Sequence, residues 1–184
     1  MDLPICIEAA QLGDAPAIVK IARKAAPLQY ENAGIPMAES QLEETLLSAW
    51  SLGVVKPILM HPKKHTLVAK DHHNHIPGFC TVSFEEACPF NLAMGNDKEW
   101  ASIDALYVDP TAHRRGIRSS LLEAVELVAK QRGCLKIWLT VLEGNEAALN
   151  LYEKRRYVVV ESTDFPPEFG IPNDYIMVKY SEAE

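Results

Sequence analysis

The fold is decided by the stretch Asp104-Ala-Leu-Tyr-Val-Asp-Pro-Thr-Ala-His-Arg-Arg-Gly-Ile-Arg-Ser-Ser-Leu-Leu122. The residues from Leu106 to Val108 are apolar and favour a strand. Pro110 cannot continue a strand because proline lacks the backbone N–H that a sheet requires. Gly116 permits a tight turn, and the apolar spacing that follows predicts a helix from about Ile117. The stretch therefore predicts a strand, a short basic turn and a helix.

The basic turn has the chemical features of a phosphate site. The first turn of a helix leaves backbone N–H groups without partners and carries the positive end of the helix dipole. His113, Arg114, Arg115 and Arg118 add positive charge around it. These features favour a bound phosphate. The alternative is an ordinary helix start with exposed arginines and no ligand.

Length and charge exclude several classes of protein. With 184 residues, the chain is expected to form one domain over residues 1–184. The net charge of -7 argues against nucleic-acid binding, which usually requires a positive surface. No apolar run approaches the roughly 18 residues that a membrane span needs. In an acidic chain, the local basic cluster instead favours a small anionic ligand.

The N-terminus and the cysteines suggest a location in the cell. The first residues show no basic segment followed by an apolar core, so no secretory signal is expected. Cys6, Cys80, Cys88 and Cys134 are widely separated, and the interpretation is that they are buried free thiols. Both observations predict a cytoplasmic protein.

Hydrophobic periodicity predicts a mixed order of strands and helices. Strands are expected at 5–10, 66–70, 76–84, 100–108, 135–141, 157–160 and 175–180, and helices at 14–26, 40–50, 117–132 and 145–155. The first helix should end before Pro27, with a loop over 28–37. The segment 54–64, which contains Pro57, is a connection without an assigned structure. This order predicts an α/β fold with a mixed sheet packed between helices.

Three histidines in one turn could suggest a metal site. His72, His73 and His75 lie between two expected strands. Their spacing is not the helical or C-x-x-C spacing that brings zinc ligands together. The preferred interpretation is a solvated hairpin turn, and no metal is expected.

Three segments together resemble the GNAT superfamily of acyl-CoA-dependent N-acetyltransferases. They are Leu106-Tyr-Val-Asp-Pro110, His113-Arg-Arg-Gly-Ile-Arg118 and Val141-Leu-Glu-Gly-Asn-Glu-Ala-Ala-Leu-Asn-Leu-Tyr-Glu-Lys154. The resemblance implies a three-layer fold with a splayed central mixed β-sheet, and acetyl-CoA as cosubstrate. The cofactor-binding residues it implies are Leu106, Tyr107, Val108, His113, Arg114, Arg115, Gly116, Ile117, Arg118, Ser119, Asn145, Leu149 and Tyr152.

The chain departs from the family pattern at three positions. His113 stands where glutamine or arginine is usual, and Arg118 stands where glycine or alanine is usual. A long side chain at position 118 could crowd the pyrophosphate, or its guanidinium could pair with a phosphate. Arg156 replaces a glycine that is common after the Leu-Tyr-Glu-Lys segment.

The resemblance also implies a mechanism, in which a primary amine attacks the thioester directly in a ternary complex. Tyr152 matches the family's proton donor for the departing thiolate. Asp104 is the candidate base because strand alternation should put Trp100, Ser102, Asp104 and Leu106 on one face. Glu99 or a chain of waters is the alternative base.

The acceptor and the partners are left open at this stage. The loops 30–37 and 165–173, where the resemblance implies the acceptor binds, carry acidic side chains in or beside them, namely Glu31, Asp164, Glu168 and Asp174. These charges favour a cationic acceptor, either a small amine or a peptide amine. No nucleic acid or membrane partner is expected, and the protein could be a monomer or a homodimer. A non-catalytic module that only binds acyl-CoA is the alternative function.

Overall fold

The computed structural model describes residues 5–85, 97–163 and 173–181. Strands from the whole chain form one seven-stranded sheet with the order β1-β2-β3-β4-β5-β7-β6. The strands are β1 (Cys6–Ala9), β2 (Lys64–Lys70), β3 (Gly78–Phe84), β4 (Trp100–Val108), β5 (Lys136–Leu142), β6 (Val158–Ser162) and β7 (Asp174–Tyr180). Within the described residues, β4 and β5 are parallel, and the other neighbouring strands are antiparallel. The mixed sheet predicted from the sequence is confirmed.

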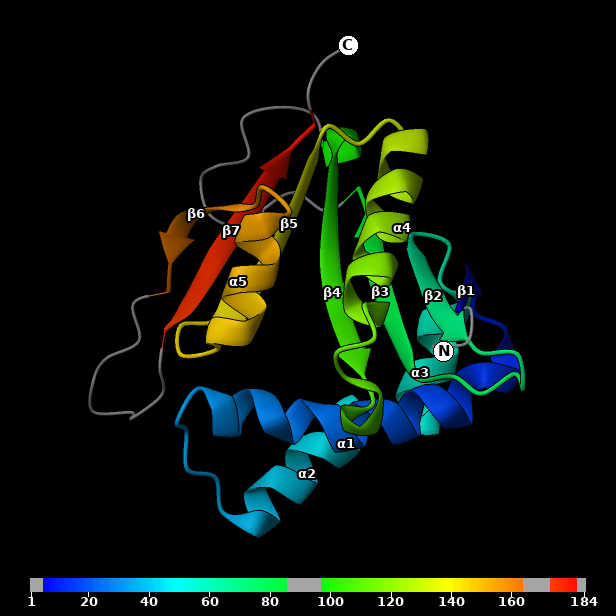
Figure 1. The fold of residues 1–184 in the computed structure, drawn as a ribbon, viewed down its shortest axis with the longest axis vertical. Helices are drawn as coiled ribbons and strands as arrows, with labels where there is room; N and C mark the ends of the chain where they lie inside the picture. Colours follow the sequence, from blue (N-terminus) through cyan, green and yellow to red (C-terminus); the bar gives the residue numbers. More distant parts are fainter. Residues whose placement is uncertain (1–4, 86–96, 164–172, 182–184) are drawn as a thin grey trace.

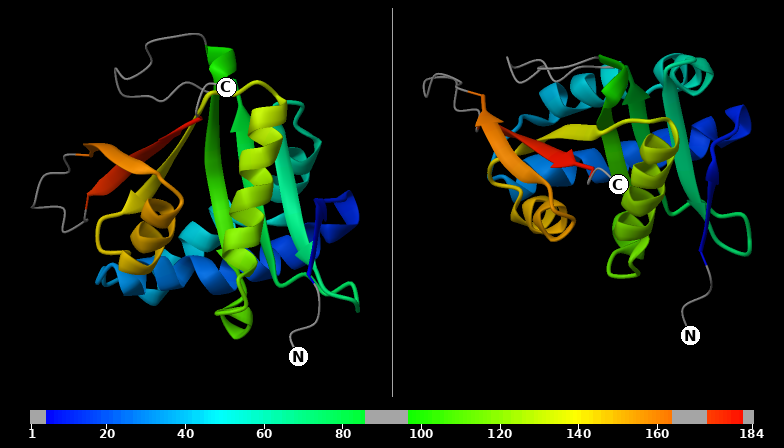
Figure 2. Two further views of the ribbon diagram at one scale, coloured as in Figure 1. Left: turned by 45° about the horizontal axis from the view of Figure 1, so that its top comes forward. Right: turned by 90° about the horizontal axis from the view of Figure 1, so that it is seen from above.

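Helices cover both faces of this sheet. They are α1 (Ala15–Asn32), α2 (Glu39–Ala49), α3 (Leu52–Met60), α4 (Ile117–Gln131) and α5 (Glu146–Lys154). The views in Figures 1 and 2 show α4 and α5 on one face and α1 to α3 on the other. The apolar stripe predicted for α4 is buried, with Leu121, Leu122 and Val125 inaccessible to solvent. The three-layer arrangement implied by the resemblance is therefore confirmed.

The sheet opens between its two parallel strands. β4 and β5 pair only through residues 100–102 and 136–138, although β4 continues to Val108 and β5 to Leu142. Beyond that point the strands diverge toward their carboxyl ends, where α1 crosses below them in Figure 1. This separation leaves room for a ligand between the strands.

A bulge in β4 reverses the alternation expected along this strand. Thr81 of β3 pairs with Ala105, whereas the next residue, Val82, pairs with Ile103, so Asp104 is the extra residue. Ile103 belongs to the core cluster beneath α4, and Ala105 belongs to the cluster beneath α1 and α3. The prediction that residues 100, 102, 104 and 106 share one face is wrong at Leu106, which packs on the α4 side. An extra residue in one strand shifts every following side chain to the other face.

Two helices contain prolines that the sequence analysis had treated as breaks. α1 continues through Pro27 to Asn32, so the predicted loop from residue 28 begins too early. The segment left unassigned around Pro57 is the helix α3. Ala25 and Ala26 are buried, as is Val55 of α3. Packing of these helices against the sheet outweighs the hydrogen bond lost at each proline.

Smaller differences concern helix starts and cysteines. The second helix begins at Glu39, with Ala38 as its N-cap, one residue before the predicted start at 40. Cys80 and Cys134 are buried free thiols as expected, but Cys6 is an exposed one. Cys88 and residues 165–172 of the predicted acceptor loop lie outside the described residues.

Candidate active site

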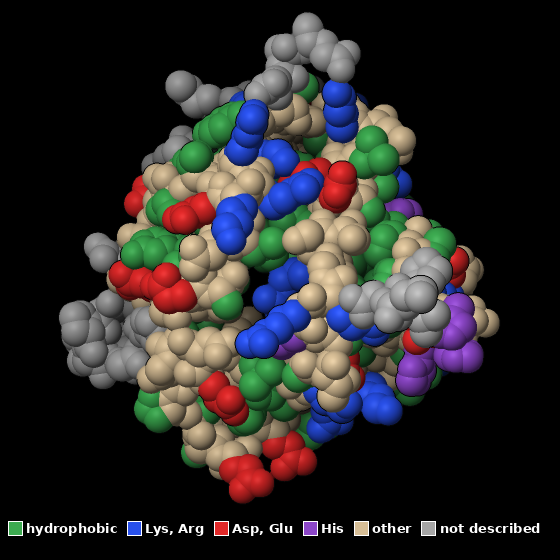
Figure 3. All heavy atoms as spheres, in the orientation of Figure 1, with side chains coloured by type: hydrophobic (Ala, Val, Ile, Leu, Met, Phe, Trp, Pro, Cys, Tyr) green, Lys and Arg blue, Asp and Glu red, His purple; other side chains and the backbone are tan. Residues whose placement is uncertain are grey.

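A cavity of about 410 Å³ occupies the opening between β4 and β5. Its lining combines α1, β4, the turn after β4, β5, α5 and the first residue of β7. Figure 3 shows a hollow between α4 and α5, above α1, with Lys and Arg side chains around it. Its lining residues are Ala25, Leu28, Gln29, Tyr30, Asn32, Ile103, Asp104, Ala105, Leu106, Tyr107, His113, Arg118, Thr140, Val141, Leu142, Asn145, Ala147, Ala148, Tyr152 and Asp174.

The turn at the start of α4 has the backbone geometry of an anion site. Arg114 and Gly116 both have positive φ angles, 65° and 73°. The Ser120 N–H donates to the Gly116 carbonyl, so the N–H groups before it have no partner inside the helix. A β-carbon at Gly116 would meet no heavy atom within 4 Å. Successive N–H groups in such a turn form an open concavity that suits phosphate oxygens.

Two basic side chains connect this turn to the cavity. His113 lines the cavity, and its Nε2 lies 3.2 Å from the Val108 carbonyl oxygen. Arg118 also lines the cavity and is half-buried. Its guanidinium forms no ion pair within the described part of the chain. A half-buried guanidinium beside the helix start is an added binding group for an anion.

Tyr152 and Asn145 approach the cavity from α5. The Asn145 side chain caps the helix by accepting the Ala148 N–H at 3.3 Å, and it lines the cavity as well. Tyr152 is buried, and its ring packs edge-on to that of Tyr157 at 5.7 Å. Burial is the main cause that raises the pKa of Tyr152, and Arg118 opposes the rise. The phenol therefore keeps its proton throughout the neutral range.

Tyr107 faces the opposite side of the sheet from α5. Its ring packs against Trp50 and Phe79 in the layer under α1 and α3. Burial, reinforced by Tyr30 and opposed by a hydrogen bond with Gln29, raises the pKa of Tyr107 to about 12. Its side chain thus lies on the α1 side of the cavity, away from the basic turn.

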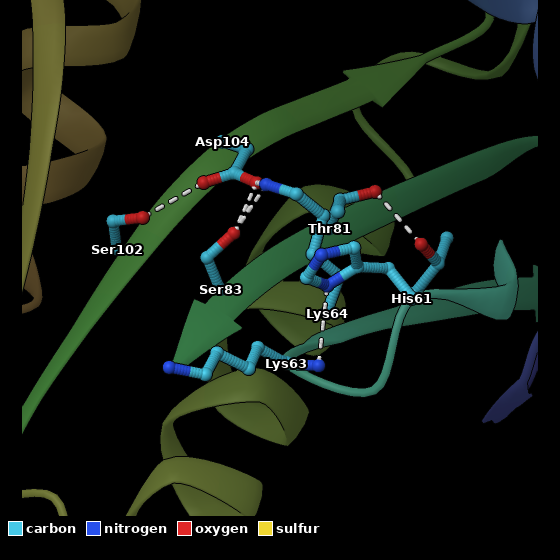
Figure 4. A network of polar contacts seen from close by, with 8 residues as sticks. His61, Lys63, Lys64, Thr81, Ser83, Ser102 and Asp104 are labelled. Atoms are coloured by element: carbon cyan, nitrogen blue, oxygen red, sulfur yellow. Dashed lines mark hydrogen bonds and ion pairs between the residues drawn. The ribbon is translucent and has the colours of Figure 1, made fainter. Parts of the chain in front are cut away.

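Asp104 is the centre of a polar network on β2, β3 and β4, drawn in Figure 4. Lys64 Nζ forms an ion pair with Asp104 Oδ2 at 2.6 Å. The hydroxyl of Ser83 donates to the same oxygen, also at 2.6 Å, and the hydroxyl of Ser102 donates to Oδ1 at 2.7 Å. Both carboxylate oxygens are therefore engaged. Such a carboxylate is held in one orientation, with its charge balanced by the lysine.

Some of the residues implied by the resemblance do not line the cavity with their side chains. Val108, Ile117 and Leu149 are buried in the core cluster under α4 and α5. Arg114, Gly116 and Ser119 are exposed, and Arg115 is half-buried. The four residues of the second group, Arg114 to Gly116 and Ser119, lie in or next to the turn. There, backbone N–H groups rather than side chains are available to a ligand.

Several residues at the site were not found from the sequence. Lys64 and Ser83 come from strands whose pairing with β4 is known only from the fold. The C-terminal half of α1 reaches the cavity because the helix continues past Pro27. Asp174 had been noted only as one of several loop charges, and it lines the cavity because β7 pairs with β5 at Leu142.

The described residues also bear on the predictions about a metal site and a membrane span. His72 and His73 stack at 3.7 Å between ring centroids. No group of three or more His, Cys, Asp or Glu side chains in that part of the chain is arranged to hold a metal ion. Within the same ranges, no helix has the length and apolar character needed to cross a membrane.

A parallel pair of strands that opens over a basic helix start, with a tyrosine opposite, is the arrangement that the resemblance to acyl-CoA-dependent transferases implied. The profile of the acetyltransferase (GNAT) family matches residues 26–157. The chain therefore belongs to the GNAT family, and it is an acyltransferase.

Curated relatives agree with this membership. An uncharacterised N-acetyltransferase of Mycobacterium tuberculosis is 25% identical over 166 residues, which cover 90% of this chain and 97% of the relative. An acetyltransferase of Pectobacterium atrosepticum is 39% identical over 89 residues, which cover 48% of this chain and 63% of that protein.

Solved structures share the fold. The PaiA N-acetyltransferase from Thermoplasma acidophilum, determined in complex with coenzyme A, has a TM-score of 0.77 at 22% identity, covering 97% of this chain and 99% of that one. An acetyltransferase of the GNAT family from Staphylococcus aureus has a TM-score of 0.67 at 13% identity, covering 97% and 100%.

Proposed function

We propose that the protein transfers an acetyl group from acetyl-CoA to a primary amine of a small molecule or a peptide, in a ternary complex. The observation that carries this proposal is the cavity of about 410 Å³, which joins the basic helix start to Tyr152 through the gap between β4 and β5. A related fold, that of the Thermoplasma acidophilum protein, is known with coenzyme A bound.

The residues at the basic turn fit the phosphates of acetyl-CoA. Positive φ angles at Arg114 and Gly116 turn consecutive N–H groups outward, and the space above Gly116 is open. A pyrophosphate there would accept backbone N–H groups and gain from the dipole of α4. Arg118 would pair with a phosphate oxygen or cover the pantetheine arm, since its guanidinium has no ion-pair partner in the described ranges. Leu106 and Val108 would offer strand backbone groups to the pantetheine amides.

The chemical step would need one group to accept a proton and one to donate it. The amine nitrogen attacks the thioester carbon, the carbon–sulfur bond breaks, and the nitrogen loses a proton as the thiolate gains one. Tyr152 is our candidate donor, because it lines the cavity and its raised pKa keeps the phenol protonated. The acetyl-CoA supplies only the activated acyl group.

We propose that Asp104 helps to remove the proton that the amine loses, through a water molecule. Its carboxylate already receives hydrogen bonds from Lys64, Ser83 and Ser102, which limits direct proton abstraction. A fixed negative charge at the cavity wall would still orient a water and stabilise the proton that leaves the amine. Glu99, the alternative candidate, does not line the cavity.

The location in the cell is also a proposal. Cys6, Cys80 and Cys134 are free thiols, and unpaired cysteines are typical of reducing compartments. We place the protein in the cytoplasm, as a monomer or homodimer without a nucleic-acid or membrane partner.

Two measurements test the proposed function. Calorimetry should detect acetyl-CoA binding, and a thiol-release assay over a panel of primary amines should detect turnover. Binding without turnover on any amine would support the alternative, a module that only binds acyl-CoA. No binding of acetyl-CoA would reject both functions.

A further inference from the structure

The charges that line the cavity are divided between two places. Positive charge lies at the start of α4, where His113 and Arg118 line the wall. Asp174 lies elsewhere, at the first position of β7, where it pairs with Leu142 at the end of β5. The loop after β5 touches the end of α1, because a β-carbon on Gly144 would lie 2.7 Å from Ala33 Cα. Asp174 and Asn32, the last residue of α1, both line the cavity, on either side of the loop that follows β5.

The Asp174 carboxylate has no partner within the residues that the structure describes. It forms none of the ion pairs there, and only the backbone of Asp174 is hydrogen-bonded: its N–H donates to Thr163 Oγ1 at 2.7 Å, and its carbonyl accepts the Thr163 N–H at 2.9 Å. The side chain is half-buried, and this desolvation raises the pKa of Asp174. The Asp104 carboxylate, by contrast, has a cationic partner, Lys64. A half-buried carboxylate without a cation is costly, and a cationic ligand would offset that cost.

The end of α1 adds a second negative feature at the same place. The helix ends at Asn32, which lines the cavity, and its last turn contains no basic side chain. A helix C-terminus carries partial negative charge and is stabilised by cations. Glu31, in this last turn, adds a further negative charge rather than compensating for it. Asp174 and the helix end thus make this part of the wall electronegative.

We propose that Asp174 binds a positively charged group of the acceptor other than the amine that is acetylated. The enzyme then selects amines that carry a second cationic group. The reacting amine is excluded from this role because a carboxylate beside an ammonium stabilises the protonated form, which cannot attack. The inference rests on the proposed function and gives Asp174 the role of a specificity-determining residue.

A matched pair of acceptors tests this role. Cadaverine and pentylamine have the same carbon chain, and only cadaverine has a second ammonium. The wild type should prefer cadaverine in kcat/KM. The variant Asp174→Asn should lose about 10- to 100-fold of that preference, mainly through KM for cadaverine, as expected for a hydrogen-bonded charge pair.

The control is Glu161→Gln, which removes the same charge from the exposed side of β6, outside the cavity. This variant should have the same kcat/KM as the wild type for both amines. The Asp174 carboxylate has no partner in the described fold and its burial is costly, so the melting temperature of Asp174→Asn should not fall below that of the wild type.

Three results would overturn the inference. They are equal kcat/KM of the wild type for the two amines, an equal fall for both amines in Asp174→Asn, and turnover of neither amine. The proposed function is tested separately, by the calorimetric binding of acetyl-CoA and by turnover of the wider amine panel. Failure of this inference is therefore distinguishable from failure of the proposed function.

Discussion

Replacing Tyr152 with phenylalanine isolates the proton donor from its surroundings. The Tyr152→Phe variant keeps the aromatic ring that packs on Tyr157 at 5.7 Å, and removes one hydroxyl, which has no hydrogen-bond partner in the described structure. The free energy of unfolding should therefore change by less than about 1 kcal/mol. A lost general acid typically lowers turnover by at least about 100-fold, which corresponds to roughly 2.7 kcal/mol in the barrier.

The assay is thiol release under saturating acetyl-CoA, together with calorimetry of acetyl-CoA binding. We expect kcat to fall while the dissociation constant stays within about threefold, because the phenol acts on the departing thiolate and not on the bound phosphates. Tyr157→Phe is the matched control, since Tyr157 is also buried but does not line the cavity. An unchanged kcat in Tyr152→Phe, or an equal loss in both variants, would refute the proton-donor role.

Three further substitutions test the cavity and the backbone around it. Arg118→Leu should weaken acetyl-CoA binding by about 10-fold in calorimetry, with the deficit shrinking at high salt, and an unchanged affinity would contradict its role. Gly144→Ala places a β-carbon 2.7 Å from Ala33 Cα and 2.8 Å from its carbonyl oxygen, so thermal unfolding should show a loss of about 1 to 3 kcal/mol. Arg156→Gly should raise the melting temperature by about 2 to 4 °C, because Arg156 has a φ of 68°; a fall would show that contacts of the Arg156 side chain outweigh the backbone strain.

Local signals in the sequence were sufficient for the centre of the site. β4 ends at Val108 and α4 begins at Ile117, as predicted, because Pro110 and Gly116 act within a few residues of themselves. The same holds for Asn145, whose cap on α5 is a bond to a residue three positions away. Geometry that depends on residues close together in the sequence can be predicted from one sequence.

Features that depend on distant pairing were not predictable. The bond from Lys64 to Asp104 joins residues that are 40 positions apart, and it needs β2, β3 and β4 in register. The bulge at Asp104 breaks a period of two that the apolar residues alone cannot reveal. Pro27 would end an isolated helix, but α1 is held by its packing on the sheet.

The bulge at Asp104 explains how β4 places side chains on both sides of the cavity. Without the extra residue, Leu106 would share a face with Ser102, and Tyr107 would lie under α4. With it, Leu106 faces the α4 and α5 layer, where the cofactor turn and Tyr152 lie, while Tyr107 faces α1. The Asp104 carboxylate, which accepts three hydrogen bonds, belongs to the residue at which this change occurs. The proposed cofactor side and acceptor side of the cavity are thus set by the same short segment of β4.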